Sequence, residues 1–325
     1  MDLILKINKK TLNIKKISLF LALTFGFSWL TALIIYMTGI EYGSVLSMVL
    51  VAVFYMPAPA LSTIIVQKWI YKEKTKSYGW ILKGLSIKWL FATIVLSICF
   101  VLGTIGIVYL FGNELGIESF GKMDFSEEGF NSKIINIIYE SIEESNLNID
   151  LESQLSESPI TINPIWIFLI ILVVGIVAAF TINIPFMFGE EFGWRGLLLK
   201  ETQNLGFLKS NLFIGLIWGF WHAPIILMGH NYPENPIIGV GMMILLTIVI
   251  SFPFAYSRLK TKSILGPCIM HGMLNGTAGS VVLFTNGGNN LICSIAGVAG
   301  IIGITFVTLG IFLFDKKFIR EYKIL

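Results

Sequence analysis

The chain has 325 residues, of which 55% are hydrophobic and only 13% are charged. A soluble globular protein carries about 25% charged residues, so this composition excludes an ordinary soluble domain. We expect the lipid bilayer as a partner and no nucleic acid. The hydrophobic residues form blocks of about 20, the length at which a helix crosses about 30 Å of hydrocarbon. We therefore predict an all-α polytopic membrane protein that forms a single membrane domain over residues 1–325.

The first apolar run is longer than the core of a cleavable signal peptide, and no A-x-A-like site follows it. We therefore expect it to be retained as a helix. No internal repeat relates the apolar runs, which disfavours an inverted-repeat transporter. In chain order, the predicted transmembrane helices are about eight and cover residues 17–38, 44–67, 89–111, 164–188, 209–229, 237–257, 263–284 and 293–314.

Basic residues gather on one side of these predicted spans. Of the 23 Lys and Arg, all but Lys122 and Lys133 fall in the two tails and in the loops after the second, fourth and sixth spans. Because cytoplasmic loops are enriched in Lys and Arg, we predict that both termini are cytoplasmic. A composition rich in Lys, Ile and Asn is typical of an AT-rich bacterial genome, so we expect a multi-pass protein of a bacterial plasma membrane, the cell membrane.

The loop at residues 112–163 is predicted to be extracytoplasmic, and it is acidic, with eleven Asp and Glu against two Lys. Within it, residues 133–145 carry apolar residues at helical spacing and predict a short amphipathic helix. A solvated surface loop is the simpler interpretation. A role in substrate gating or partner binding is the alternative.

The three cysteines, Cys99, Cys268 and Cys293, are scattered through apolar runs, and no C-x-x-C pair occurs. This pattern predicts neither a disulfide framework nor a thiolate metal site. We expect three small buried side chains.

Ionisable side chains inside predicted spans are rare and mark function by default. Counted from the basic ends of their spans at 1.5 Å per residue, His222 lies about 20 Å deep, His271 about 14 Å, Asn275 about 20 Å and Glu190 about 15 Å. These groups on the fourth, fifth and seventh spans can therefore meet in one polar pocket, which we expect to open toward the cytoplasm. His230 lies near the outer end of its span, far from the others in depth, and is predicted to be an interfacial residue.

The adjacent glutamates have different neighbours if residues 186–199 are helical. Glu191 and Arg195 are then four residues apart on one face, in the favourable order of acid before base. Glu190 is turned about 100° away and has Trp194 four residues on, so it is left unpaired and can act as a general base for water. The alternative is that Glu190 only caps a helix end.

Two further pairs at the same spacing share helix faces. His271 and Asn275 follow Gly266-Pro267, a natural helix start, and both can donate hydrogen bonds to an oxyanion. Trp218 and His222 also share a face, so the indole ring can hold the imidazole in place. An interhelical hydrogen bond is the purely structural alternative for either histidine.

Taken in order on three predicted spans, these motifs resemble the CPBP family of intramembrane proteases. This family is also called ABI and includes the type II CAAX proteases and bacteriocin immunity proteins. The resemblance covers residues 164–284, which we take as the predicted protease core. The usual aromatic residue of the second motif is Phe, whereas this chain has Trp. The three motifs are Glu190-Glu191-x-x-x-Arg195, Trp218-x-x-x-His222 and His271-x-x-x-Asn275.

The resemblance implies that Glu190 and His222 activate the attacking water and that His271 and Asn275 form the oxyanion hole. The second glutamate and its arginine would support them. It also points to a metal-free, glutamate-type mechanism without a cofactor. A zinc site formed by Glu190, His222 and His271 is the alternative, although none of them occurs in a spacing such as H-E-x-x-H that places two ligands on one helix.

The predicted function is therefore that of an intramembrane endopeptidase, a peptide hydrolase. A bacteriocin self-immunity or binding protein of the same fold, which needs no turnover, is the first alternative, and a transporter is the second. We expect a peptide or a membrane-anchored protein as the substrate, because prenylated CAAX proteins are not expected in a bacterium.

Overall fold

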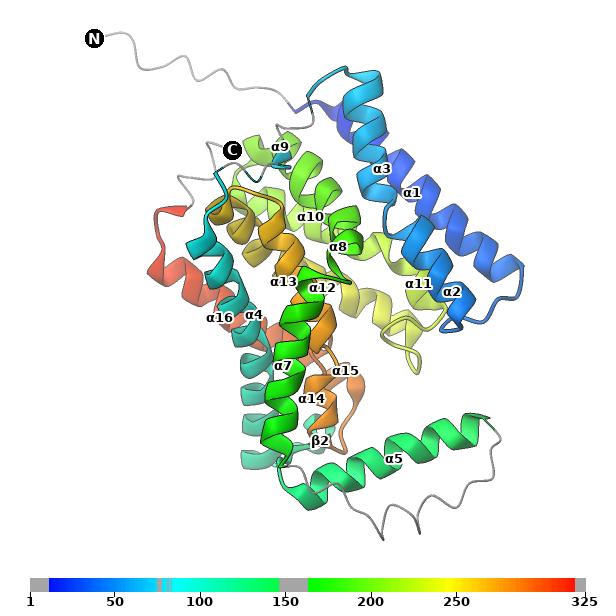
Figure 1. Cartoon of the computed structure of the whole chain (residues 1–325), viewed down its shortest axis with the longest axis vertical. Helices are drawn as coiled ribbons and strands as arrows, with labels where there is room; N and C mark the ends of the chain where they lie inside the picture. Colours follow the sequence, from blue (N-terminus) through cyan, green and yellow to red (C-terminus); the bar gives the residue numbers. More distant parts are fainter. Residues whose placement is uncertain (1–11, 75–77, 81, 83, 146–162, 319–325) are drawn as a thin grey trace.

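A computed structural model of the chain describes residues 12–74, 78–80, 82, 84–145 and 163–318 (Figure 1). The described residues are predominantly helical, which confirms the all-α prediction. The α-helices are α1 (Ile14–Met37), α2 (Val45–Leu50), α3 (Ala58–Ile64), α4 (Ile87–Val108), α5 (Glu127–Ser145), α7 (Pro164–Phe180), α8 (Ile184–Glu191), α9 (Leu199–Thr202), α10 (Phe207–Trp221), α11 (Ala223–Leu227), α12 (Pro236–Thr261), α13 (Leu265–Thr277), α14 (Ser280–Leu283), α15 (Asn290–Cys293) and α16 (Val298–Phe314).

Shorter elements join or extend these helices. Two strands of two residues pair antiparallel, with Lys122 opposite Asn286. The π-helical turns are η1 (Val51–Tyr55), η2 (Ile65–Ile70), η4 (Tyr109–Glu114) and η6 (Phe192–Leu198), the 3₁₀ turns are η5 (Glu118–Phe120) and η7 (Gln203–Leu205), and the strands are β1 (Lys122–Met123) and β2 (Thr285–Asn286).

Ion pairs mark one end of the bundle, which we call the basic end. Lys16 at the start of α1 lies 2.7 Å from Glu73 and 3.0 Å from Glu201 of α9. Lys260 at the end of α12 lies 2.7 Å from Asp315, which follows α16. The start of α1 and the end of α16 therefore lie at the same end of the molecule, as an even number of crossings requires.

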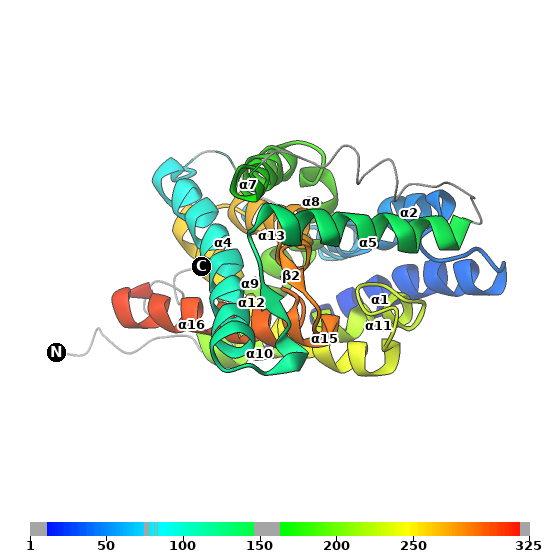
Figure 2. The same ribbon diagram turned by 90° about the horizontal axis from the view of Figure 1, so that it is seen from below.

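The opposite end, which we call the loop end, holds β1, β2, α5 and residues 38–44 and 229–235. Residues 229–235 are tied to the start of the last helical segment because the Tyr232 hydroxyl donates to the carbonyl oxygen of Ala296 at 2.7 Å. Helix α5 runs across this end of the bundle, roughly at right angles to α7 (Figures 1 and 2). The amphipathic helix predicted at 133–145 is thus present and begins earlier, at Glu127. Residues 146–162 of the predicted loop lie outside the described residues.

The polytopic architecture is confirmed, whereas the count of eight spans is not. The predicted span 209–229 is divided between α10 and α11, the predicted span 263–284 is divided between α13 and α14, and the predicted span 164–188 is bent. A sixth crossing results if the bent pair Pro164–Phe180 and Ile184–Leu205 forms one span. Within the described residues, the helical segments long and apolar enough to cross a membrane are Ile14–Met37, Val45–Ile70, Ile87–Glu114, Pro236–Thr261 and Asn290–Phe314.

Candidate active site

Both glutamates lie at the end of α8, a short helix that begins after a sharp break in the chain. The segment that starts with α8 makes an angle of 62° with α7. Pro185 occupies the first turn of α8, where a missing N–H leaves no hydrogen bond unmade. Asn183 Nδ2 donates to the carbonyl oxygen of Gly272 at 2.9 Å. The break thus directs α8 into the bundle and fixes its start to α13, the helix that carries His271.

Two glycines allow this part of the chain to lie directly against α3. A Cβ at Gly189 would stand 3.0 Å from the carbonyl oxygen of Met56, and one at Gly193 would stand 2.5 Å from Cβ of Pro59. This close packing leaves Glu190 2% exposed and the second glutamate 0%. Carboxylates at such positions are costly unless they are partnered, so their hydrogen bonds define the site.

Glu191 is the carboxylate paired with a cation, as the sequence predicts. Its Oε2 lies 3.1 Å from Nη1 of Arg195, and both side chains are fully buried. Arg195 also donates to Oγ of Ser251 on α12 at 3.1 Å, and its guanidinium lies 4.2 Å from the centre of the Trp218 ring. The pair therefore fixes α8 and η6 to α10 and α12.

Glu190 has a partner that the sequence does not predict. Its Oε2 accepts a hydrogen bond from Nε1 of Trp218 at 2.9 Å. The prediction that Glu190 is unpaired is therefore wrong in this respect, although its partner is a neutral donor. Trp194, the neighbour expected from helical spacing, packs edge-on against Phe20 and Trp221 instead, with ring centres 5.8 and 5.7 Å away.

His222 directly follows the last residue of α10. Its Nδ1 lies 2.8 Å from the carbonyl oxygen of Trp218. A carbonyl only accepts, so Nδ1 carries the proton, and Nε2 of the neutral ring keeps a free lone pair. Trp218 therefore holds two candidate groups at once: its indole binds Glu190 and its backbone binds His222.

On α13, Nδ1 of His271 lies 3.0 Å from Oε1 of Glu191. The carboxylate accepts this bond, so the proton sits on Nδ1, and Nε2 can donate as well only when the ring is doubly protonated. One turn later, Nδ2 of Asn275 lies 3.5 Å from Sδ of Met187, within reach of only a weak hydrogen bond. The Asn275 side chain is exposed and is available to a ligand.

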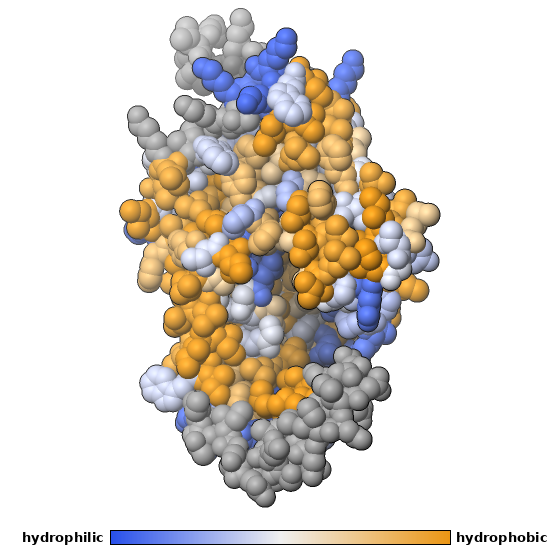
Figure 3. All heavy atoms as spheres, turned by 45° about the vertical axis from the view of Figure 1, so that its right-hand side comes forward, coloured by the Kyte–Doolittle hydropathy of each residue, from blue (hydrophilic) through white to orange (hydrophobic). Residues whose placement is uncertain are grey.

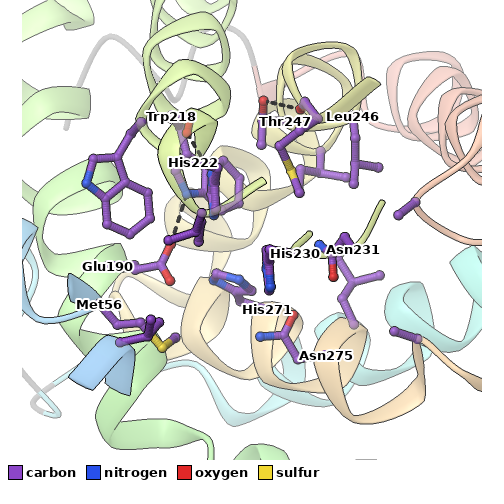
Figure 4. A pocket seen from close by; sticks show the side chains of 18 of the residues that line it. Met56, Glu190, Trp218, His222, His230, Asn231, Leu246, Thr247, His271 and Asn275 are labelled. Carbon is purple, nitrogen blue, oxygen red and sulfur yellow. Dashed lines mark hydrogen bonds between the residues drawn. The ribbon is translucent and has the colours of Figure 1, made fainter. Parts of the chain in front are cut away.

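One cavity of about 390 Å³ brings these side chains together. Glu190, His222, His271 and Asn275 all line it, and Figure 4 shows them around the same space. The rest of its wall is mainly apolar and comes from α2, η1, α12 and residues 295–304. On the face shown in Figure 3 the molecule is hollowed near its centre, with hydrophilic atoms in the hollow.

One prediction about this cavity is wrong. His230 was expected far from the other histidines, yet it lines the same cavity. The chain turns after α11 at Gly229, whose φ of +106° suits a residue without a Cβ, and the backbone N–H of His230 bonds back to Ile225 O. The cavity was also predicted to open toward the cytoplasm, and its lining includes Tyr42 and Asn231 of the loop end.

Two residues of the site, Tyr55 and Ser251, and the contact of the Trp218 indole with Glu190 were missed in the sequence. Tyr55 of η1 is fully buried beside the cavity, and its hydroxyl donates to the carbonyl oxygen of Trp221. Ser251 binds Arg195, and the Trp218 indole binds Glu190. No spacing pattern could reveal Tyr55 or Ser251, because they lie far from the motifs in sequence. The Trp in place of the usual Phe was a signal for the contact between Trp218 and Glu190, because an indole has an N–H donor and a phenyl ring has none.

A catalytic zinc ion needs about three protein ligands around it. Among the described residues, no group of three or more His, Cys, Asp or Glu side chains is placed so that it could hold one metal ion. The alternative ligand set Glu190, His222 and His271 is therefore not arranged as a metal site in this structure.

The structure thus places carboxylate, imidazole and amide groups around one cavity of a helical protein with several helices apolar and long enough to cross a membrane. Residues 161–277 match the family model of type II CAAX prenyl endopeptidase Rce1-like proteins. This match covers somewhat more than a third of the chain and contains all three motifs. The matched segment is thus similar to this family of CAAX-type intramembrane proteases, which supports the resemblance seen in the sequence. No curated protein matches the chain.

Proposed function

We propose that the chain is an intramembrane endopeptidase in which Glu190 activates a water molecule for attack on a peptide carbonyl. The observation that carries the proposal is the double use of Trp218, which orients the Glu190 carboxylate through its indole and the His222 ring through its backbone. Both groups face one cavity. Because Trp218 fixes both groups, the Glu190 carboxylate and the His222 ring can each accept one hydrogen of the same water molecule.

In this mechanism Glu190 accepts a proton from the water molecule while the water oxygen bonds to the carbonyl carbon of the peptide. His222 accepts the other hydrogen of the water at Nε2 and orients it. The proton on Glu190 then passes to the amine that leaves when the peptide bond breaks. Because Trp218 donates to only one oxygen of Glu190, the second oxygen remains available for the water.

His271 and Asn275 are the proposed donors to the developing oxyanion. Asn275 offers its amide N–H groups, and His271 donates through Nε2 when the ring is doubly protonated, while its Nδ1 remains bonded to the Glu191 carboxylate at 3.0 Å. Donors placed toward developing charge stabilise the transition state. The hydrogen bond between His271 and Glu191 thus links the second glutamate to the proposed chemistry as well as to the fold.

The substrate that we propose is a peptide or a membrane-anchored protein, bound without a metal or other cofactor. The substituted protein Glu190→Gln tests the assignment, because the amide oxygen of Gln can still accept from Trp218 while the basic carboxylate is lost. Purified protein in detergent is incubated with a peptide library, and products are mapped by mass spectrometry. We expect turnover to fall by at least about 10²-fold with an unchanged melting temperature.

Glu234→Gln is the matched control, because Glu234 is exposed and lies outside the cavity. Retention of more than a few per cent of the parental turnover by Glu190→Gln would remove Glu190 from the role of base. If the parental protein cleaves nothing, and cells carrying Glu190→Gln remain fully protected against a bacteriocin, the binding or immunity alternative holds instead. Ion flux that depends on Glu190 would indicate a transporter.

A further inference from the structure

In the long helices that line the cavity, the lining residues lie in the half nearer the loop end. In the segment Val45–Ile70, the cavity residues lie between Met48 and Met56, near its start at the loop end. In α12, which also starts at the loop end, they lie between Met243 and Ile250, short of the last eleven residues. In α10, which runs the other way, they begin at Trp218, close to the C-terminal end.

No residue of the basic end lines this cavity within the described part of the chain. Lys16 and Glu201 are joined at 3.0 Å at that end, and Lys260 and Asp315 are joined at 2.7 Å. Between this layer and the cavity lie the buried Arg195, with its ion pair to the second glutamate, and several closely packed helix contacts. A peptide arriving from the basic end would have to displace this buried ion pair.

At the loop end, polar side chains border the cavity. The hydroxyl of Tyr42 lies 2.7 Å from Nδ1 of His230, and the two rings meet edge-on with centres 5.8 Å apart. This contact joins residues 38–44 to residues 229–235. Asn231, the next residue, is exposed and also lines the cavity, and Figure 4 shows it beside His230.

We propose that the substrate reaches Glu190 and His222 from the extracytoplasmic side of the membrane, past Tyr42, His230 and Asn231. The side follows from charge: the basic end carries the Lys and Arg that membrane insertion keeps in the cytoplasm, so the loop end faces outward. The proposal rests on the protease function proposed above and specifies its substrate, a peptide or membrane-anchored segment presented from the outer leaflet. A C-terminal tail in the cytoplasm does not fit this geometry.

The lining also sets the chemistry of the substrate. Met48, Val51, Leu246, Ile250 and Leu274 form apolar walls between the polar mouth and the polar cluster. Apolar side chains of a peptide can fill this stretch, while its backbone groups find donors and acceptors at the polar mouth and at the polar cluster. The substrate is therefore an apolar peptide segment of a few residues, with polar or charged parts left outside.

Cysteine labelling tests the direction of access without any need for turnover. A charged, membrane-impermeant thiol reagent is applied to intact cells and, separately, to inverted vesicles. The reporters are Asn275→Cys inside the cavity and Asn231→Cys at its mouth. Glu234→Cys is the control at the loop end outside the cavity, and Lys209→Cys, exposed at the start of α10, is the control at the basic end. The unmodified chain, with two buried cysteines and one half-buried, gives the background.

We expect both reporters to react at least about tenfold faster in intact cells than in inverted vesicles, because the hydrocarbon excludes a charged reagent. Lys209→Cys should show the reverse. Faster reaction of Asn275→Cys in inverted vesicles would overturn the proposal, and so would equal rates from both sides. Asn231→Cys serves the same purpose if Asn275→Cys does not fold.

A second arm uses a peptide that the parental protein cleaves. A bulky maleimide on Asn231→Cys should slow cleavage about tenfold or more, as expected when a group fills the entrance, while the same adduct on Glu234→Cys should leave it unchanged. Unimpeded cleavage after complete modification of Asn231→Cys would refute entry by this route. If the parental protein cleaves no peptide while Asn275→Cys is labelled from outside, the protease function is refuted and the direction of access stands.

Discussion

Replacing Trp218 by Phe isolates the hydrogen bond that the usual residue of this motif cannot make. The indole Nε1 lies 2.9 Å from Oε2 of Glu190, and the two residues are 1% and 2% exposed. A hydrogen bond to a charged group contributes about 1.5–3 kcal/mol, and a buried carboxylate that loses its donor retains the desolvation cost. The phenyl ring of the variant would still lie beside Arg195 and His271 but would leave this oxygen of Glu190 without its donor.

We expect Trp218→Phe to lower kcat by about 10- to 100-fold, which corresponds to about 1.4–2.8 kcal/mol of transition-state stabilisation. KM should change little, because Glu190 acts on the water and not on the substrate side chains. Steady-state kinetics on a cleaved peptide and a thermal melt measure both effects. Trp166→Phe is the control, since Trp166 is 63% exposed on α7. A kcat equal to that of the parental protein would show that the indole does not orient the base.

Three further predictions concern the support of the site. Glu191→Ala leaves Arg195 buried without its carboxylate and should destabilise the fold by about 3–5 kcal/mol, seen as poor expression and a lower melting temperature; normal stability would show that the ion pair is not structural. Gly219→Ala should lower the melting temperature because its Cβ would stand 2.5 Å from Cα of Ile244, whereas Gly241→Ala, with nothing within 4 Å, should not; equal effects would contradict the close packing of α10 on α12. Exhaustive chelation with metal analysis should leave an active, zinc-free enzyme, and activity that is lost on chelation and restored by stoichiometric zinc would establish a metal mechanism.

Local spacing was sufficient to predict part of the site. The ion pair between Glu191 and Arg195 spans one helical turn, and it forms even though η6 is wound as a π-helix. Depth along a helix is also a local quantity, so counting residues from the basic ends placed His222 and His271 near Glu190. Both inferences need only the rise and the turn of a helix.

Contacts between helices could not be predicted in this way. Trp218 and Glu190 are 28 residues apart, and His271 and Glu191 are 80 apart. Which ring nitrogen faces which carboxylate depends on the rotation of each helix about its axis, and packing against neighbours sets that rotation. His230 was misplaced for a related reason: depth was counted as though the fifth span were straight to its end, whereas α11 ends at Leu227 and the chain then turns back.

The structure gives a physical reason for two glutamates in succession. Neighbouring residues on a helix point about 100° apart, so the doublet can reach two different helices at the same depth. Glu190 bonds to α10 through Trp218, and Glu191 bonds to α13 through His271 as well as to Arg195. A single carboxylate could hold one of these helices and could not also remain available to a water molecule. The three sequence motifs are therefore joined by hydrogen bonds, in which the residue that binds the cation positions the other helices and its neighbour keeps one carboxylate oxygen for the proposed chemistry.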